Sequence, residues 1–263
     1  EGMVIEVDYA TKEVVWRYGQ GVTDTFSPGW VVDPFIATRL PNGNTLICDN
    51  RGERVFEVRT ADYSAGAPDD GYTADSIVWM FLAQTGTRPK YAQRLANGNT
   101  LITGASNAVL EVTPAGDIAW EVGAGVLDAP VSGVRLDNGN TLIAEERSLD
   151  TTLGSVLIVS PTGEVLWRYS VMNMLGLDDI GLDSPRRALL TPEGAVLIAD
   201  QRHSRVVELG YVPAGDAQSA QLDCGLPGAR KSFTSIAVDL DVPAGTTAVA
   251  EYSIDGGAWQ TAA

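Results

Sequence analysis

Charged residues recur beside short apolar segments, at positions where they could bind a ligand. Four of these positions lie near a proline, in VVDPF (31–35), TRPK (87–90), DAPV (128–131) and DSPR (183–186). Others follow apolar runs such as TLICD and VLIAD. If the fold brings them together, they form a polar site for a small anion, a sugar or a cation. The candidate ligand-binding residues are Asp33, Asp49, Arg51, Arg88, Asp128, Glu145, Glu146, Asp183, Asp200 and Arg202.

Metal chemistry is restricted to oxygen ligands. Carboxylates from separate segments suit Ca²⁺, which is the one cofactor that these residues could hold; no other cofactor is predicted. The metal candidates Asp178, Asp179 and Asp183 lie in SVMNMLGLDDIGLDSP (170–185), but they lack EF-hand spacing. The two cysteines form no CxxC motif, which argues against a zinc or iron–sulfur site. Cys48 is either a small buried thiol or the partner of Cys224 in a disulfide.

His203, in DQRHSRV, is the only histidine and the only candidate catalytic residue. Histidine acts as a nucleophile or general base only when other groups assist it. The sequence also contains no G-x-S-x-G, HExxH, P-loop or Rossmann motif. These observations favour a non-catalytic protein and leave enzymatic activity as an open alternative.

The composition excludes several partners. The net charge is −16 and the pI is near 4.3. Nucleic acid and anionic membrane surfaces would repel such a chain. No apolar run is long enough to span a membrane. The acidity suits an extracellular or cell-surface setting, so we expect that location.

A repeat must position the charged residues. RLPNGNTLI (39–47) recurs as RLANGNTLI (94–102) and RLDNGNTLI (135–143), and a fourth, divergent copy is ALLTPEGAVLIAD (188–200). The turn glycines are spaced by 55, 41 and 55 residues. Asn-Gly predicts a β-hairpin with a two-residue turn, in which both residues adopt positive φ.

Each repeat continues with two more apolar segments. The third segment is RVFEV (54–58), AVLEV (108–112), SVLIV (155–159) or RVVEL (205–209). The fourth carries a tryptophan, and the equivalent residues Trp16, Trp79, Trp120 and Trp167 are predicted to pack between units. Arg39, Arg94 and Arg135 precede the hairpins, and their repetition favours salt bridges between units over a role in lining a channel. The unit is four short strands that cannot bury both faces alone, so neighbouring units must stack.

These observations predict an all-β fold, a β-propeller of four-stranded antiparallel blades. Residues 1–211 would form four recognisable blades after a half-blade at 1–19. Residues 212–263 would form a small β-sandwich-like domain or, alternatively, strands that close the propeller. The loops between strands two and three, and between blades, share the face around the channel mouth. That face should carry the candidate ligand-binding residues.

Several segments resemble known propeller repeats. EVDYATKEVVWRY and IVSPTGEVLWRY resemble PQQ-like repeats. LICDNRGERVFEV and LIADQRHSRVVEL resemble NHL repeats, and RLPNGNTLI is similar to arylsulfotransferase-like propellers. Together they cover roughly residues 1–210. The resemblance implies a propeller but identifies no single activity.

Three functions follow as hypotheses. The favoured one is a non-catalytic extracellular or cell-surface module that binds a protein or glycan partner. The second is an arylsulfotransferase-like or lyase-like enzyme, with His203 or arginines at the channel mouth. The third is a subunit of an extracellular filament or surface layer, which would assemble with further copies of itself.

Overall fold

A computed structural model describes residues 2–20, 27–84, 86–104, 107–146, 154–170, 181–210, 251–252 and 260–261. The chain divides into two compact units, residues 1–215 and 216–263. In the second unit the described residues are two short antiparallel strands, β18 (Glu251–Tyr252) and β19 (Gln260–Thr261). A separate C-terminal sandwich therefore stays a prediction.

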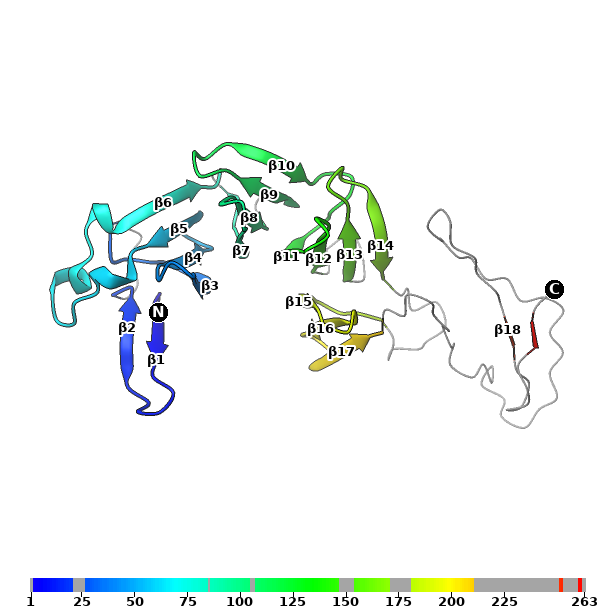
Figure 1. Ribbon diagram of the computed structural model, residues 1–263, viewed down its shortest axis with the longest axis horizontal. Helices are drawn as coiled ribbons and strands as arrows, with labels where there is room; N and C mark the ends of the chain where they lie inside the picture. The colour runs from blue at the N-terminus through cyan, green and yellow to red at the C-terminus, as the bar shows by residue number, and fades with distance from the viewer. Residues whose placement is uncertain are drawn as a thin grey trace. The chain divides into compact units, whose positions relative to one another are not determined.

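The first unit consists of antiparallel sheets built from consecutive strands (Figure 1). We call the sheets blades 1 to 4. Blade 1 comprises β3 (Pro34–Arg39), β4 (Thr45–Asp49), β5 (Arg54–Val58) and β6 (Ile77–Leu82). Blade 2 comprises β7 (Tyr91–Arg94), β8 (Thr100–Thr103), β9 (Val109–Val112) and β10 (Ile118–Val122). Blade 3 comprises β11 (Pro130–Arg135), β12 (Thr141–Glu145), β13 (Ser155–Val159) and β14 (Val165–Tyr169).

Blade 4 and the N-terminal hairpin have fewer described strands. Blade 4 contains β15 (Pro185–Leu190), β16 (Val196–Asp200) and β17 (Arg205–Leu209). The N-terminal hairpin contains β1 (Val4–Val7) and β2 (Val14–Tyr18), which correspond to the third and fourth strands of a blade. The predicted all-β propeller with four blades is confirmed.

The insertion between β5 and β6 holds the N-terminal hairpin in place. It contains three short 3₁₀ helices, η1 (Thr60–Asp62), η2 (Pro68–Gly71) and η3 (Ala74–Ser76). Asp70 is buried and forms a bidentate ion pair with Arg17 of β2. The Tyr72 ring lies 4.7 Å from that of Tyr18.

The hairpin turn differs from the one that Asn-Gly predicts. In blade 1 the Gly43 amide donates to the Leu40 carbonyl, and Gly43 has φ +86° while Asn42 is not in the left-handed region. The hairpin loop therefore has three residues, and it is a type I turn followed by a glycine with positive φ. The Asn42 side chain donates from Nδ2 to Glu57 of β5.

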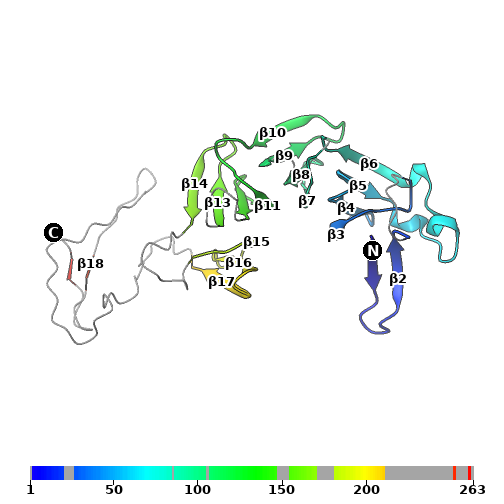
Figure 2. The same cartoon turned by 180° about the vertical axis from the view of Figure 1, so that it is seen from behind.

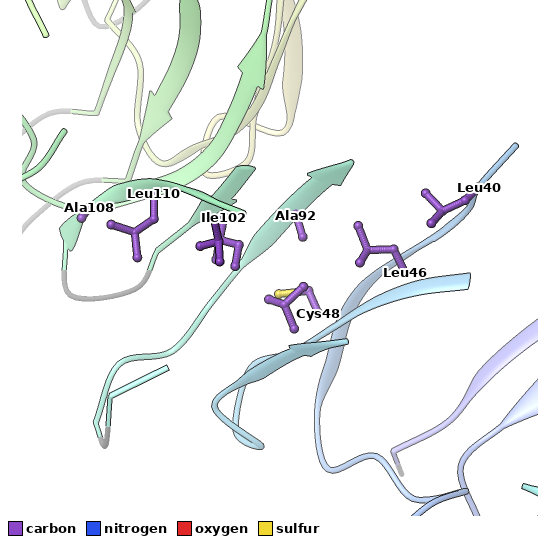
Figure 3. Close-up of a cluster of buried hydrophobic side chains, with 9 residues drawn as sticks. Leu40, Leu46, Cys48, Ala92, Ile102, Ala108 and Leu110 are labelled. Carbon is purple, nitrogen blue, oxygen red and sulfur yellow. The ribbon is translucent and has the colours of Figure 1, made fainter. Parts of the chain in front are cut away.

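Neighbouring blades bury their apolar faces against each other. The first strands contact in series, β3 with β7, β7 with β11 and β11 with β15. Figures 1 and 2 both show β7, β11 and β15 on one side of the row of sheets and β10 and β14 on the other. Between blades 1 and 2, Leu46 and Cys48 meet Ile102 and Leu110 (Figure 3). Trp79, Trp120 and Trp167 each pack against the cluster between their own blade and the next.

An arginine clamp, repeated along the chain, adds polar contacts to each of these interfaces. Arg94, at the end of β7, donates to Glu57 of the preceding blade at 2.7 Å, and its guanidinium carbon lies 4.8 Å from the centre of the Trp79 ring. Arg135 binds Glu111 and Trp120 in the same way, and Arg39 binds Glu6 and Trp16. These arginines therefore form salt bridges between units, as the repetition indicates.

The asparagines of the NGN turn orient the glutamate of the clamp. Asn97 and Asn99 both donate to one Glu111 oxygen, and Arg135 takes the other. Burial alone would raise the pKa of Glu111, but the two amides and the Arg135 charge outweigh it and hold the pKa below its ordinary value. The repeated turn thus serves blade packing.

Candidate functional site

Three of the candidate carboxylates close the second strand of a blade and are buried. Asp49, Glu145 and Asp200 end β4, β12 and β16. Each accepts a backbone N–H from the loop that leads into its own blade, at 2.7–2.8 Å. The donors are the amides of Asp33, Asp128 and Asp183. The carboxylates therefore anchor the loops between blades.

The other oxygens of these carboxylates are also engaged within the blade. Arg54 Nε donates to Asp49 at 3.1 Å, and Arg205 Nε donates to Asp200 at 3.0 Å. Each arginine lies directly opposite its aspartate in the strand register. Glu145 instead accepts Ser155 Oγ at 2.6 Å and Arg168.

His203 replaces a backbone contact of blade 1. Its Nδ1 lies 2.7 Å from Asp200 Oδ2. At the equivalent position of blade 1 is Gly52, whose amide donates to Asp49. Glu53 follows Gly52 and Ser204 follows His203. Both have a φ of 51°, which shows that the two turns have the same form. His203 is thus one more partner of a structural carboxylate.

Charged residues from three blades form ion pairs at the partly exposed surface. Glu146, directly after β12, accepts Lys90 Nζ at 3.1 Å and an Arg186 guanidinium nitrogen at 2.9 Å. Arg186 also donates to Gln201, directly after β16. The charged side chains are 24–35% exposed. We call Lys90, Glu146, Arg186 and Gln201 the mouth network, because all four lie where first strands begin or second strands end.

A second contact between first strands lies beside the mouth network. Arg187 donates to the Tyr91 hydroxyl at 3.2 Å, and its guanidinium carbon lies 5.1 Å from the centre of the Tyr91 ring. It links β15 to β7, which belong to blades that are not sequence neighbours. With Lys90 and Arg186, it places three cationic side chains close to Glu146, on a protein whose net charge is strongly negative.

Sequence analysis identified only one member of the mouth network, Glu146. Lys90 and Arg186 adjoin the prolines in TRPK and DSPR, in the same loops as the predicted Arg88 and Asp183. Among the other candidates, the Asp33 and Asp183 side chains are half-buried. The exposed candidates are Arg51, Arg88, Asp128 and Arg202.

Two of the three predicted metal ligands, Asp178 and Asp179, lie outside the described residues. Cys224, the possible disulfide partner of Cys48, also lies outside them. Cys48 is a buried free thiol, and desolvation raises its pKa. In the part of the chain that is described, no three His, Cys, Asp or Glu side chains gather closely enough to hold a metal ion. In the same part, no helix is long and apolar enough to cross a membrane.

The sequence matches no protein-family profile and no curated protein. The structure is similar to the WD40 β-propeller domain of Doa1, with 10% identity over 76% of this chain and 55% of that chain and a TM-score of 0.51. It is also similar to virginiamycin B lyase from Staphylococcus aureus, with 14% identity, 77% and 61% coverage and a TM-score of 0.48. A third similar structure is BBS1N in complex with ARL6DN, with 10% identity, 79% and 52% coverage and a TM-score of 0.47.

The chain spans between half and two thirds of the length of these solved chains. At such low identity the similarity concerns the fold and not the activity. The stacked four-stranded sheets and the match to the WD40 domain agree on one conclusion: the chain is a β-propeller.

Proposed function

We propose that this protein is a non-catalytic binding module of the extracellular space or cell surface, and that it holds an anionic group of a protein or glycan partner at the mouth network. The observation that carries the proposal is the convergence of Lys90, Glu146 and Arg186, from three blades, in one partly exposed cluster. Three other carboxylates at this end of the blades, Asp49, Glu145 and Asp200, are buried and hydrogen-bonded within their own blades.

The chemistry of the cluster favours an anion. Lys90, Arg186 and Arg187 outnumber Glu146, and arginine binds carboxylate, sulfate or phosphate oxygens in a planar, two-pronged geometry. The acidic net charge repels anions from much of the surface, which would direct them to this cationic cluster. The Arg187 and Tyr91 side chains next to it add a flat surface suited to a sugar ring or a planar side chain.

The contacts of His203 are accounted for without the enzymatic alternative. A histidine base can have Nδ1 bound to a carboxylate, but it also needs a substrate pocket and assisting groups around the free Nε2. His203 is bound to Asp200, which also holds Arg205 and the Asp183 amide. This is the role that a backbone amide fulfils in blade 1.

An array experiment tests the proposal. The protein is screened at low salt against neutral, uronic acid-bearing and sulfated oligosaccharides and against acidic and basic peptides. We expect retention by anionic probes, and a loss of affinity of about tenfold or more in a Lys90→Ala/Arg186→Ala double variant. Glu146→Gln should strengthen binding, because it removes the competing carboxylate.

Two controls make the experiment decisive. Arg59→Ala removes an arginine that is 46% exposed and pairs with Asp62, three residues along the chain, so it should leave binding unchanged. An equal loss of affinity in Arg59→Ala and in the Lys90→Ala/Arg186→Ala variant would contradict a localised site. Turnover of an aryl sulfate that disappears in His203→Ala would establish the enzyme instead.

A further inference from the structure

A polar groove lies between the first strands of blades 1 and 2. Its volume is about 290 Å³, and its walls are the β3 residues around Thr38 and the β7 residues from Tyr91 to Arg94. Both blades contain all four of their strands, so the groove does not depend on further strands of the propeller. One end of it adjoins the mouth network, because Tyr91 directly follows Lys90.

The next interface along the chain shows which chemical group fits such a groove. Gln93 of β7 reaches across to β11, where its Oε1 accepts the Arg135 backbone N–H at 2.9 Å. The strand registers give Gln93 the position that Thr38 has in blade 1, and they give Arg135 the position of Arg94. A carboxamide held by a backbone donor therefore fills the space between the first strands of blades 2 and 3.

The groove between blades 1 and 2 presents the same donor without the carboxamide. The Leu95 N–H donates to the Asn99 carbonyl at 2.8 Å, so the Arg94 N–H, one residue earlier, points away from β8. The residue at the Gln93 position is Thr38, which is exposed and has a shorter side chain. Among the described residues no side chain accepts the Arg94 N–H. A ligand can therefore take the place that Gln93 fills in the next blade.

The dimensions and burial of the groove favour a small polar group over a peptide strand. A strand that paired with β7 would also need the backbone of Ala92, the other residue of β7 that points away from β8. Ala92 is only 3% exposed, because it packs in the cluster between blades 1 and 2 (Figure 3). The volume of about 290 Å³ lies near the lower limit of ligand pockets, about 300 Å³, and so suits one ring with a side group.

We infer that this groove binds the acetamido group of an N-acetylated sugar, whose carbonyl oxygen accepts the Arg94 N–H. The acetamido group has the same carbonyl acceptor and N–H donor as the carboxamide of Gln93, and the Thr38 hydroxyl can bond to either. The Tyr91 ring at the end of the groove adds an aromatic surface for the sugar ring. The choice of a sugar rests on the proposed function and narrows its partner to a glycan that carries N-acetylhexosamine residues.

Nuclear magnetic resonance of the full, isotope-labelled chain tests the inference with a neutral probe. N-Acetylglucosamine is titrated to millimolar concentrations while the Arg94 backbone amide is followed. We expect a saturable shift of this resonance and at least about tenfold weaker binding of glucose, which lacks the acetamido group. Thr38→Gln should abolish the response, because it supplies the side chain that fills the next interface. Thr11→Gln, in an exposed turn, should leave the response unchanged.

The reverse exchange tests the comparison with Gln93. Gln93→Thr removes the internal carboxamide, so the probe should then shift the Arg135 amide as well. No Arg135 response in the folded variant, or equal responses of the native protein to glucose and N-acetylglucosamine, would overturn the inference. So would an Arg94 shift caused by a glutamine-containing tripeptide and not by the sugar, because the occupant would then be a protein side chain.

The charge of the probe separates this inference from the proposed function. N-Acetylglucosamine is neutral, so the Lys90→Ala/Arg186→Ala variant should bind it as the native protein does. Loss of the Arg94 shift in that variant would place the sugar at the mouth network and overturn the inference. If no anionic probe is retained in the array while N-acetylglucosamine still shifts Arg94, the proposed anion site alone is wrong.

Discussion

The arginine clamp between blades 2 and 3 should be replaceable by apolar residues, because the interface between blades 3 and 4 has apolar residues at the equivalent positions. Arg135 and Glu111 form the clamp. One blade later, the strand registers place Leu190 and Ile158 at the same two positions. We therefore expect the double variant Glu111→Ile/Arg135→Leu to be about as stable as the native protein.

The single variants should be much less stable. Glu111→Ile removes the acceptor of Arg135, whose side chain is only 15% exposed, and of two asparagine amides. Leaving a mostly buried charge without its partner costs about 3–5 kcal/mol when burial is complete, so we expect about 2–4 kcal/mol here. Arg135→Leu leaves Glu111 with its two amide donors and should cost about 1–2 kcal/mol. Replacing both members of a buried ion pair by apolar residues is often neutral.

Urea unfolding, followed by tryptophan fluorescence, measures these differences. We expect a coupling free energy of about 3–6 kcal/mol in the double-mutant cycle, because the two single penalties sum to this range and the double variant lies within about 1 kcal/mol of the native protein. Additive penalties would refute the reasoning, since they would show that the glutamate and the arginine act through separate contacts.

Three further predictions concern the same packing. Gly133→Val should destabilise the protein by about 1–3 kcal/mol in urea unfolding, because the valine side chain would clash with Thr103 and Val109. Ala92→Gly removes only a methyl group from the equivalent position of blade 2 and should destabilise the protein less. In a Cys224→Ser background, the Cys48 thiol should resist alkylation until the protein unfolds, since it is buried and its pKa is raised; labelling of the folded protein at the rate of a free thiol would contradict this. The folded-state pKa of Glu111 is lowered, so its contribution is complete above the unfolded value of about 4.3 and is lost as the pH falls through the folded value. Glu111→Gln should therefore flatten the decline in unfolding free energy between about pH 5 and pH 3.

The repeat made the fold predictable. The glycine spacing, the apolar segments and the tryptophan positions together indicated four-stranded units that must stack, and the blades have these strands. The turn geometry was mispredicted because Asn-Gly also fits a three-residue turn, in which only the glycine has positive φ. The Asn42 side chain donates to Glu57 of the third strand, and such a contact between a turn and a distant strand cannot be deduced from a dipeptide.

The candidate site was only partly predictable. Prolines and strand ends indicated the loops in which Lys90 and Arg186 also lie, but the residue types there do not reveal which side chains are buried. Asp49 and Asp200 are buried and accept backbone amides of the loops that lead into their own blades. Glu146, one residue beyond a strand end, is partly exposed to solvent. Arg186 and Lys90 became candidates only once the blades placed them beside the same carboxylate.

The most direct test of the proposed binding function is to map a bound probe by nuclear magnetic resonance. The best anionic probe from the array is added to isotope-labelled protein, and backbone and side-chain shifts are followed. We predict the largest changes at Lys90, Glu146 and Arg186, with the amides of the repeated NGN turns unaffected. Changes concentrated at those turns, or at His203 without the mouth network, would contradict the proposal.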